Sequence, residues 1–451
     1  MLRLIERFCR EGDGNVAIIV ALMILPMLVL AGGATDLARY EAHRAQLQDG
    51  VDRAVLAAAS LQQTVPVETT VADYLKSLGF IEDVELNYDY AVALNARTVK
   101  VTARYAMPAG FLPLIGINDL PMTVVAQAQE KRSNIEMSLM LDLSGSMIGS
   151  KYTSLKSAAT QFVQSMITPE TSAYTSLNIV PYAGQVSVGR TVFDALNGAR
   201  THNNSSCFEL YRPDYASGLL NFNRRAQVPH FTVWNGSDQK PTLPANLNPG
   251  WCPSDNTSIT VMSNDRTDLA NRIAGYQMYD GTGTAIAMNW GLLLLDPALR
   301  PLIHQAVGGG IVPATFAGRP ADFTDGNTLK VMILMTDGAI TEQYTAKDAS
   351  KDVRAGSNAK LFRDTTYSSD QTVTETKKHF NTVCAAAKAK SVLVFTIGFQ
   401  LSDTDSSQRA MKTELRNCAT SSSHYYDVQG LDIAAAFRSI ATTIQKVKLT
   451  Q

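Results

Sequence analysis

The sequence predicts an α/β protein: a doubly wound, mostly parallel sheet preceded by a transmembrane helix and a small α+β unit. Three observations lead to this prediction. A long uncharged segment lies near the N-terminus, alternating β-rich segments follow it, and apolar strands then alternate with helices to the C-terminus. Continuous apolar strands separated by helices indicate a parallel sheet that is covered on both faces.

The composition is that of a globular protein without a global charge bias. The 451 residues include 40 Lys and Arg against 41 Asp and Glu; 18% of the residues are charged and 45% are hydrophobic. These values argue against a disordered chain. The balanced charge gives no reason to expect a nucleic-acid partner, and the length suggests two or more folding units.

The uncharged segment predicts a membrane anchor. Asp13 and Asp36 enclose 22 residues without a charge, which as a helix would extend about 33 Å and cross a hydrocarbon core of about 30 Å. We expect a short tail over residues 1–14 and a transmembrane helix over residues 15–35. A cleaved signal peptide is the alternative, but the apolar stretch is longer than the usual signal core and lacks a clear Ala-x-Ala site.

The flanking charges decide the orientation only weakly. Three arginines precede the span and three follow it closely, so the positive-inside count is nearly a tie. The short N-terminal flank and the large remainder favour a chain whose N-terminus is inside and whose bulk is outside.

Residues 36–132 read as a stalk helix and a small α+β unit. In residues 36–63, Ala and Leu recur at helical spacing with charges between them, and no break separates them from the span. Residues 85–94 and 98–107 alternate and are rich in β-branched and aromatic residues, which predicts a hairpin, and residues 122–131 predict a further strand.

The alternation of strand and helix patterns over residues 134–447 predicts that this segment is the main domain. An insertion at about 185–265 interrupts this pattern; it is rich in Asn, Ser, Pro and Gly, and we expect it to be a loop. Its Trp234 and Trp251 either form an exposed aromatic patch or pack the insertion. The expected strands are 135–143, 176–183, 329–337, 391–400 and 424–428, and the expected helices are 151–167, 284–296, 373–390, 408–419 and 431–448.

The cysteines are compatible with an oxidising compartment. Cys9 precedes the span, and the remaining four form an even set without the CxxC spacing of a zinc site. Three pairings are open; the local one joins Cys207 to Cys252 and Cys384 to Cys418. Four reduced, buried thiols are the alternative.

Oxygen-bearing side chains follow the expected strands. Asp142, Ser144 and Ser146 leave the first strand, Asp337 leaves another, and Thr284 stands in a Gly-rich loop before a helix. In open parallel sheets, ligands bind beyond the carboxyl ends of the strands. An all-oxygen set suits a hard divalent cation, Mg²⁺ first, with Mn²⁺ or Ca²⁺ as alternatives. With few carboxylates, such a cation can accept an acidic group from a partner.

The stretch DLSGSM, residues 142–147, resembles the DxSxS motif of von Willebrand factor A-type domains, the metal-ion-dependent adhesion site. The resemblance implies that Asp142, Ser144, Ser146 and Thr284 bind the ion directly or through water, and that Asp337 acts through water. It implies a Rossmann-like fold and a protein-binding function. Asp142 and Thr284 are farther apart than such compact domains need, and the insertion accounts for the difference.

Residues 11–60 resemble the N-terminus of TadG/TadE-like Flp pilus-assembly proteins of the bacterial envelope. This implies a single-pass inner-membrane protein, with its bulk periplasmic or exported to the cell surface, that binds an acidic side chain of a pilus or envelope component in assembly or adhesion. A structural, pseudopilin-like scaffold assembling through the N-terminal helix is the alternative. Cleavage after Gly14 is disfavoured because Ile19 replaces the glutamate of prepilin signals.

An enzymatic function agrees less well with the sequence. Ser144 is not in a G-x-S-x-G context, and none of the six histidines stands in an evident triad. The stretch GSMIGSK, residues 145–151, lacks the spacing of a phosphate-binding loop. Asp142 or Asp337 alone could be a helix cap, so the metal prediction depends on the whole set. We expect no enzymatic activity.

Overall fold

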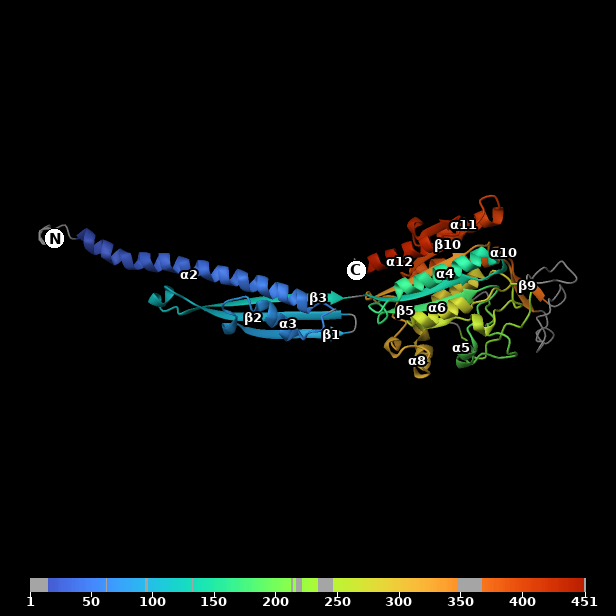
Figure 1. The fold of residues 1–451 in the computed structure, drawn as a ribbon, viewed down its shortest axis with the longest axis horizontal. Helices are drawn as coiled ribbons and strands as arrows, with labels where there is room; N and C mark the ends of the chain where they lie inside the picture. The colour runs from blue at the N-terminus through green and yellow to red at the C-terminus, as the bar shows by residue number, and fades with distance from the viewer. Residues whose placement is uncertain are drawn as a thin grey trace. The chain divides into compact units, whose positions relative to one another are not determined.

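The chain divides into two compact units, Met1–Arg132 and Ser133–Gln451 (Figure 1). The predicted tail over residues 1–14, Cys9 and Trp234 lie outside the described residues. The computed structural model describes residues 15–61, 63–93, 96–131, 133–211, 214–215, 221–233, 246–346 and 367–449.

The first unit is a three-stranded antiparallel sheet packed against helices. Its strands lie in the order β1-β2-β3, with β1 at Glu85–Ala93, β2 at Ala96–Pro108 and β3 at Asp119–Lys131. The predicted hairpin and third strand are therefore confirmed. Buried and exposed residues alternate along β2 and β3, because only one face of the sheet is covered.

Helix α2 (Asn15–Ala58) is continuous from the apolar segment into this unit, with Pro26 inside it. Its last turns supply Leu47, Val51 and Val55 to the core, together with β2, β3 and helix α3 (Val67–Leu75). The second half of α2 is thus a core helix of the unit and not a free stalk. Burial of its aliphatic side chains at about 25 cal/mol per Å² is the main force holding it there.

The second unit is built on a six-stranded sheet of order β11-β10-β7-β4-β5-β6, in which every pairing is parallel except that of β5 with β6. The predicted mostly parallel sheet is confirmed. The strands are β4 (Asn134–Asp142), β5 (Thr175–Tyr182), β6 (Thr260–Ser263), β7 (Thr328–Thr336), β10 (Leu393–Phe399) and β11 (Tyr425–Val428).

Helices cover both faces of this sheet, as a doubly wound fold requires. Side chains of β4 alternate between the two cores: Leu139 packs in one and Met140 in the other. The first core holds helices α4 (Ser150–Met166), α6 (Arg266–Gly275) and α12 (Ile433–Leu449). The second holds α7 (Thr284–Leu293), α8 (Arg300–Gly308), α10 (Val373–Ala389) and α11 (Ser406–Cys418).

The prediction that residues 185–265 form only a loop is wrong at two places. Helix α5 (Arg190–Ala195) lies inside this segment. The last part of the segment forms β6, the antiparallel edge strand. Strand β6 could not be predicted, because an edge strand of four residues shows no periodicity. Helices α6 and α8, and the hairpin of β8 (Gln343–Ala346) and β9 (Tyr367–Gln371), were also not predicted.

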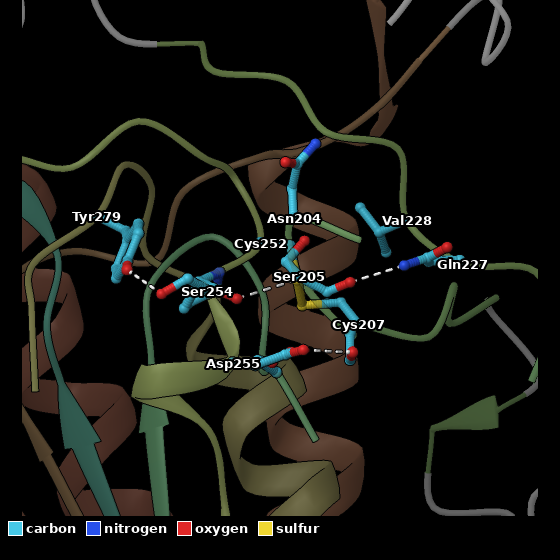
Figure 2. Close-up of a disulfide and its surroundings, with 12 residues drawn as sticks. Asn204, Ser205, Cys207, Gln227, Val228, Cys252, Ser254, Asp255 and Tyr279 are labelled. Carbon is cyan, nitrogen blue, oxygen red and sulfur yellow. Dashed lines mark hydrogen bonds between the residues drawn. A yellow bond between two sulfur atoms is a disulfide. The ribbon is translucent and has the colours of Figure 1, made fainter. Parts of the chain in front are cut away.

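Two disulfides close the second unit, in the local pairing. Cys384–Cys418 joins α10 to α11, and Cys207–Cys252 closes the insertion (Figure 2). Around Cys207 and Cys252, a small core forms from Val228, Phe231 and Trp251. Trp251 is buried there, so it packs the insertion and is not an exposed patch. The alternative of four reduced thiols is wrong.

The insertion also holds a histidine pair, buried His202 and partly buried His230, whose ring centroids lie 6.1 Å apart. Burial, and then the neighbouring His202, lower the pKa of His230 from 6.5 to about 4. The folded chain therefore binds fewer protons than the unfolded chain between these two pH values. The stability that neutral His230 contributes is complete above pH 6.5 and is lost as the pH falls to 4.

We expect acidification from pH 7 to 4 to lower the free energy of unfolding through His230 by at most about 3 kcal/mol. The variant His230→Gln should lose less stability over this range than the parent chain. Urea unfolding followed by tryptophan fluorescence measures it, because all three tryptophans belong to the second unit. Exposed His304→Gln is the control. Equal losses for the parent chain and His230→Gln would contradict the prediction.

Candidate metal centre

The candidate centre lies where the winding of the sheet reverses. From β4 the chain moves to β5 on one side, whereas from β7 it moves to β10 on the other. The neighbouring strands β4 and β7 therefore form a topological switch point, and ligands of such sheets bind beyond the carboxyl ends of the strands at this point. Asp142 is the last residue of β4, and Asp337 directly follows β7. The fold itself thus brings these two carboxylates together.

The turn after β4 presents its serines toward Asp337. The Ser144 amide donates to Asp142 Oδ1 at 2.9 Å, which holds the turn in shape. Ser144 Oγ and Ser146 Oγ lie 3.0 Å apart, and Ser146 Oγ donates to Asp337 Oδ1 at 2.5 Å. Four of the five predicted residues are therefore in one hydrogen-bonded cluster, although Ser146 and Asp337 are 191 positions apart in the chain.

Asp142 is fully buried and meets only neutral donors. Its Oδ2 accepts from Thr336 Oγ1 at 2.7 Å and from the Tyr182 hydroxyl at 3.4 Å. Burial, and then the charge of Asp337, raise the pKa of Asp142 to about 6. Among the described residues, no cationic side chain forms an ion pair with it.

Thr284, the fifth predicted residue, opens α7 beside this cluster. Burial, and then Asp142, raise the pKa of Tyr182 well above its usual value, and the hydroxyls of Thr336 and Thr284 lower it in part. Thr284 is completely buried, and its Oγ1 lies near enough to the Tyr182 hydroxyl to lower that pKa, but it does not reach hydrogen-bond geometry with any described residue. The Gly283 amide donates to Ala183 O at 2.6 Å and so fixes this loop at the end of β5. A buried hydroxyl without a partner is costly, and this one lies near the Tyr182 hydroxyl, which itself donates to Asp142 Oδ2.

Sequence reasoning missed three members of the cluster. Tyr182 and Thr336 are the last residues of β5 and β7, and their position at strand ends was the only available signal. Lys151 lies in the first turn of α4, and its Nζ is 2.7 Å from Asp337 Oδ2. The Asp337 carboxylate is therefore shared between a serine hydroxyl and an ammonium group, whereas Asp142 has no such countercharge.

The donor set fits a hard divalent cation. It combines two carboxylates with the hydroxyls of Ser144, Ser146 and Thr284, and all five groups are oxygen ligands of the kind that Mg²⁺ prefers. No group of three or more histidine, cysteine, aspartate or glutamate side chains that could hold a metal occurs in the described part of the chain. The fit thus depends on hydroxyls as much as on charge, and the unpartnered Thr284 Oγ1 is the observation that supports it best.

Comparison with known proteins gives a family match at the N-terminus. Residues 14–61 match the model of a family described as putative Flp pilus-assembly TadE/G-like, which confirms the predicted resemblance of this segment. No curated protein matches the chain.

Solved structures similar to this chain include three pilus proteins. The von Willebrand factor domain of the type V pili tip protein Mfa5 from Porphyromonas gingivalis is 13% identical, with a TM-score of 0.37 over 70% of this chain and 97% of that one. The pilus adhesin SpaC from Lactobacillus rhamnosus GG is 12% identical, with a TM-score of 0.38 over 81% of this chain but 35% of that one. The PilB minor pilin from Streptococcus sanguinis is 11% identical, with a TM-score of 0.37 over 81% and 79%. This chain thus spans about a third of SpaC.

The variant Lys151→Met tests how the two carboxylates are balanced. Without the ammonium, Asp337 is left buried beside Asp142, so the free energy of unfolding in chelator should fall by about 1–3 kcal/mol. Adding Asp337→Asn should recover most of this loss, because the two sites are coupled. Urea unfolding of the single and double variants measures the coupling, with exposed Lys388→Met as the control. Additive losses would show that Lys151 does not balance Asp337.

Proposed function

We propose that this chain is a membrane-anchored protein-binding module that recognises an acidic side chain of a pilus or envelope partner through a divalent cation. The observation that carries the proposal is the convergence of Asp142, Ser144, Ser146 and Asp337 at the switch point. The unpartnered hydroxyl of Thr284 lies near Tyr182, which hydrogen bonds to Asp142. The family match of residues 14–61 supports a role in pilus assembly or adhesion.

In this proposal the five side chains hold the ion, with Mg²⁺ as the first candidate. Mg²⁺ takes few protein oxygens and keeps several waters, so the bound ion supplies an electrophilic position at which a partner's carboxylate can replace a water. Ser146 is exposed, whereas Asp142, Ser144 and Thr284 are buried. A partner would therefore approach from the side of Ser146, and the buried residues would hold the ion from below.

The same cluster gives no support to an enzymatic role. A serine nucleophile needs a base within hydrogen-bond reach. The side chains of Ser144 and Ser146 contact each other, Asp142 and Asp337, and no histidine is among their hydrogen-bond partners in the described part of the chain. We therefore propose binding without turnover.

The membrane anchor is proposed from helix α2. Among the described residues it is the one helix that is long and apolar enough to cross a membrane, with a mean hydropathy of 2.0 in its apolar window. The two disulfides of the second unit favour an oxidising compartment. Together they support an inner-membrane protein whose larger part is periplasmic or carried to the cell surface.

Thr284→Val is the sharpest test of the centre. It removes a buried hydroxyl without a partner, so stability should stay the same or rise by up to about 1 kcal/mol, while affinity for Mg²⁺ or Mn²⁺ should fall by roughly tenfold or more. Asp142→Ala should abolish ion binding and ion-dependent partner binding in a chain that still folds. Calorimetric titration with each ion, beside urea unfolding, measures both effects.

The matched control is Thr396→Val. Thr396 is equally buried, but its hydroxyl donates to Leu415 O at 2.8 Å, on strand β10 and outside the cluster. This variant should lose about 1 kcal/mol of stability and keep its ion affinity. If Thr284→Val and Asp142→Ala bind the ions as the parent chain does, the site is not the recognition element.

A structural scaffold that assembles through α2 is the second candidate, because the apolar part of this helix is exposed. Removing residues 1–34 tests it and leaves the core residues of α2, such as Leu47 and Val51, in place. A scaffold should lose assembly, as measured by cross-linking in the envelope, whereas a recognition module should keep ion-dependent partner binding. Removing residues 1–60 would delete core residues and would not separate the two.

A further inference from the structure

We propose that the loop between β2 and β3, residues 109–118, inserts into the membrane interface beside helix α2 and forms a second membrane contact of the first unit. The inference rests on the proposed membrane anchor, and it assigns a lipid-binding role to a loop outside both resemblances noted above. Four observations support the proposal. The loop exposes apolar side chains, it lies along α2, backbone amides within it are hydrogen-bonded, and the Asp36 carboxylate of α2 binds three of its amides.

The loop exposes large apolar side chains and carries no charge. Leu114 is 68% exposed, Ile115 54%, Phe111 45% and Ile117 42%. The segment reads AGFLPLIGIN, without a charged residue. A cluster of exposed apolar side chains at the tip of a hairpin indicates a surface that is covered in the working protein.

The loop contacts α2 at the end of its apolar segment. The Phe111 side chain packs so closely on Gly32 that a Cβ there would lie 2.4 Å from it, and Leu112 packs on Gly33. In Figure 1 the tip between β2 and β3 lies beside this part of α2. Asp36 is the first charged residue after the apolar segment, and Gly32 lies four residues before it. The loop therefore reaches back along the helix from Asp36 by about 6 Å. This matches the depth of about 5–10 Å at which apolar groups enter a membrane interface.

Much of the loop's backbone is hydrogen-bonded, which suits a segment in an apolar medium. The amides of Ala109, Leu114, Gly116 and Ile117 donate to carbonyls within the loop at 2.9 to 3.2 Å. Pro113 has no amide hydrogen to satisfy. The 3-10 helix η2 (Leu112–Ile115) lies at the centre of the loop. Its Leu114 and Ile115 side chains are exposed, whereas backbone groups of this turn hydrogen bond within the loop.

Asp36 binds three further amides of the loop. Its carboxylate is buried and accepts from the amides of Gly110, Phe111 and Leu112 at 2.9, 2.7 and 2.9 Å. The Phe111 amide is the main cause of the lowered pKa of Asp36, which burial opposes. The carboxylate thus stays charged and locks the loop to α2. Exposed Arg39, one turn further on, lies close to Gly110, and its charge adds to the lowering of the Asp36 pKa.

The second contact would fix how the unit stands on the membrane. A single helix can tilt and rotate in a bilayer. A helix that carries a rigidly bonded apolar loop on one side has one rotation that buries this loop, and this rotation is favoured by the transfer of its apolar area.

The experiment measures the depth of the loop in vesicles, using the full chain with Cys9→Ser as background. Environment-sensitive labels are placed at Leu114→Cys and, independently, at Ile115→Cys. Leu28→Cys marks the proposed span, and Gln127→Cys, exposed on β3, is the control. The vesicles contain phosphatidylethanolamine and phosphatidylglycerol, with or without brominated acyl chains that quench the label.

We expect brominated lipid to quench labels at positions 28, 114 and 115 by roughly twofold or more, and the label at 127 hardly at all. If position 28 is quenched while 114 and 115 behave like 127, the anchor stands and the loop proposal is overturned. If none is quenched, the anchor itself fails and the loop proposal fails with it. If 114 and 115 are shielded from aqueous iodide without lipid quenching, a protein covers the loop and the proposal is overturned.

Discussion

The second unit depends on how negative charge is balanced at the two ends of its central strand, β4. Near the amino end, Glu136 is fully buried and has its countercharges within the chain. Lys330 Nζ lies 2.6 Å from its Oε2, Arg319 Nε lies 4.0 Å from its Oε1, and the Ala321 amide donates to Oε1 at 2.9 Å. Breaking such a buried pair from one side typically costs about 3–5 kcal/mol. These contacts join β4, β7 and the chain before β7, and so align the strands whose other ends form the candidate centre.

At the carboxyl end the balance is different. Asp142 is as deeply buried as Glu136, but among the described residues it contacts an amide and hydroxyl groups, and the charge of the Asp337 carboxylate acts on it. Lys151 offsets Asp337 from the rim of the cluster. One chain thus neutralises one buried carboxylate of β4 by its own cations and leaves the other with neutral donors. A cation from solution is the simplest group to complete the second site, and the free hydroxyl of Thr284 would serve as one of its ligands.

The meeting of the serine turn with Asp337 could be predicted from the sequence. Strands β4, β5 and β7 are long and apolar, and polar residues follow β4 and β7. Strand ends of a parallel sheet meet at one edge whatever the length of chain between them, so Ser146 and Asp337 could be placed together. The ion pairs of Glu136 were out of reach, because nothing local relates this residue to Lys330 or Arg319. Lys151, Tyr182 and Thr336 are common residue types at ordinary positions. Edge strand β6 and the core role of the second half of α2 depend on tertiary contacts, which no periodicity in their own sequence encodes.

The insertion is part of the architecture of the centre and not an appendage. Ser254, next to the disulfide, hydrogen bonds to the Tyr279 hydroxyl at 2.6 Å (Figure 2), and the Tyr279 amide donates to Leu143 O in the turn that carries the serines. On the other side, the Trp251 ring packs on Gly184, where a Cβ would lie 2.5 Å from it, and the Gly184 amide donates to Asp280 O. The disulfide-closed core therefore holds the segment 279–284 that ends in Thr284. Because this core holds both the turn after β4 and the segment before α7, changes in the insertion would reach the residues proposed to hold the ion.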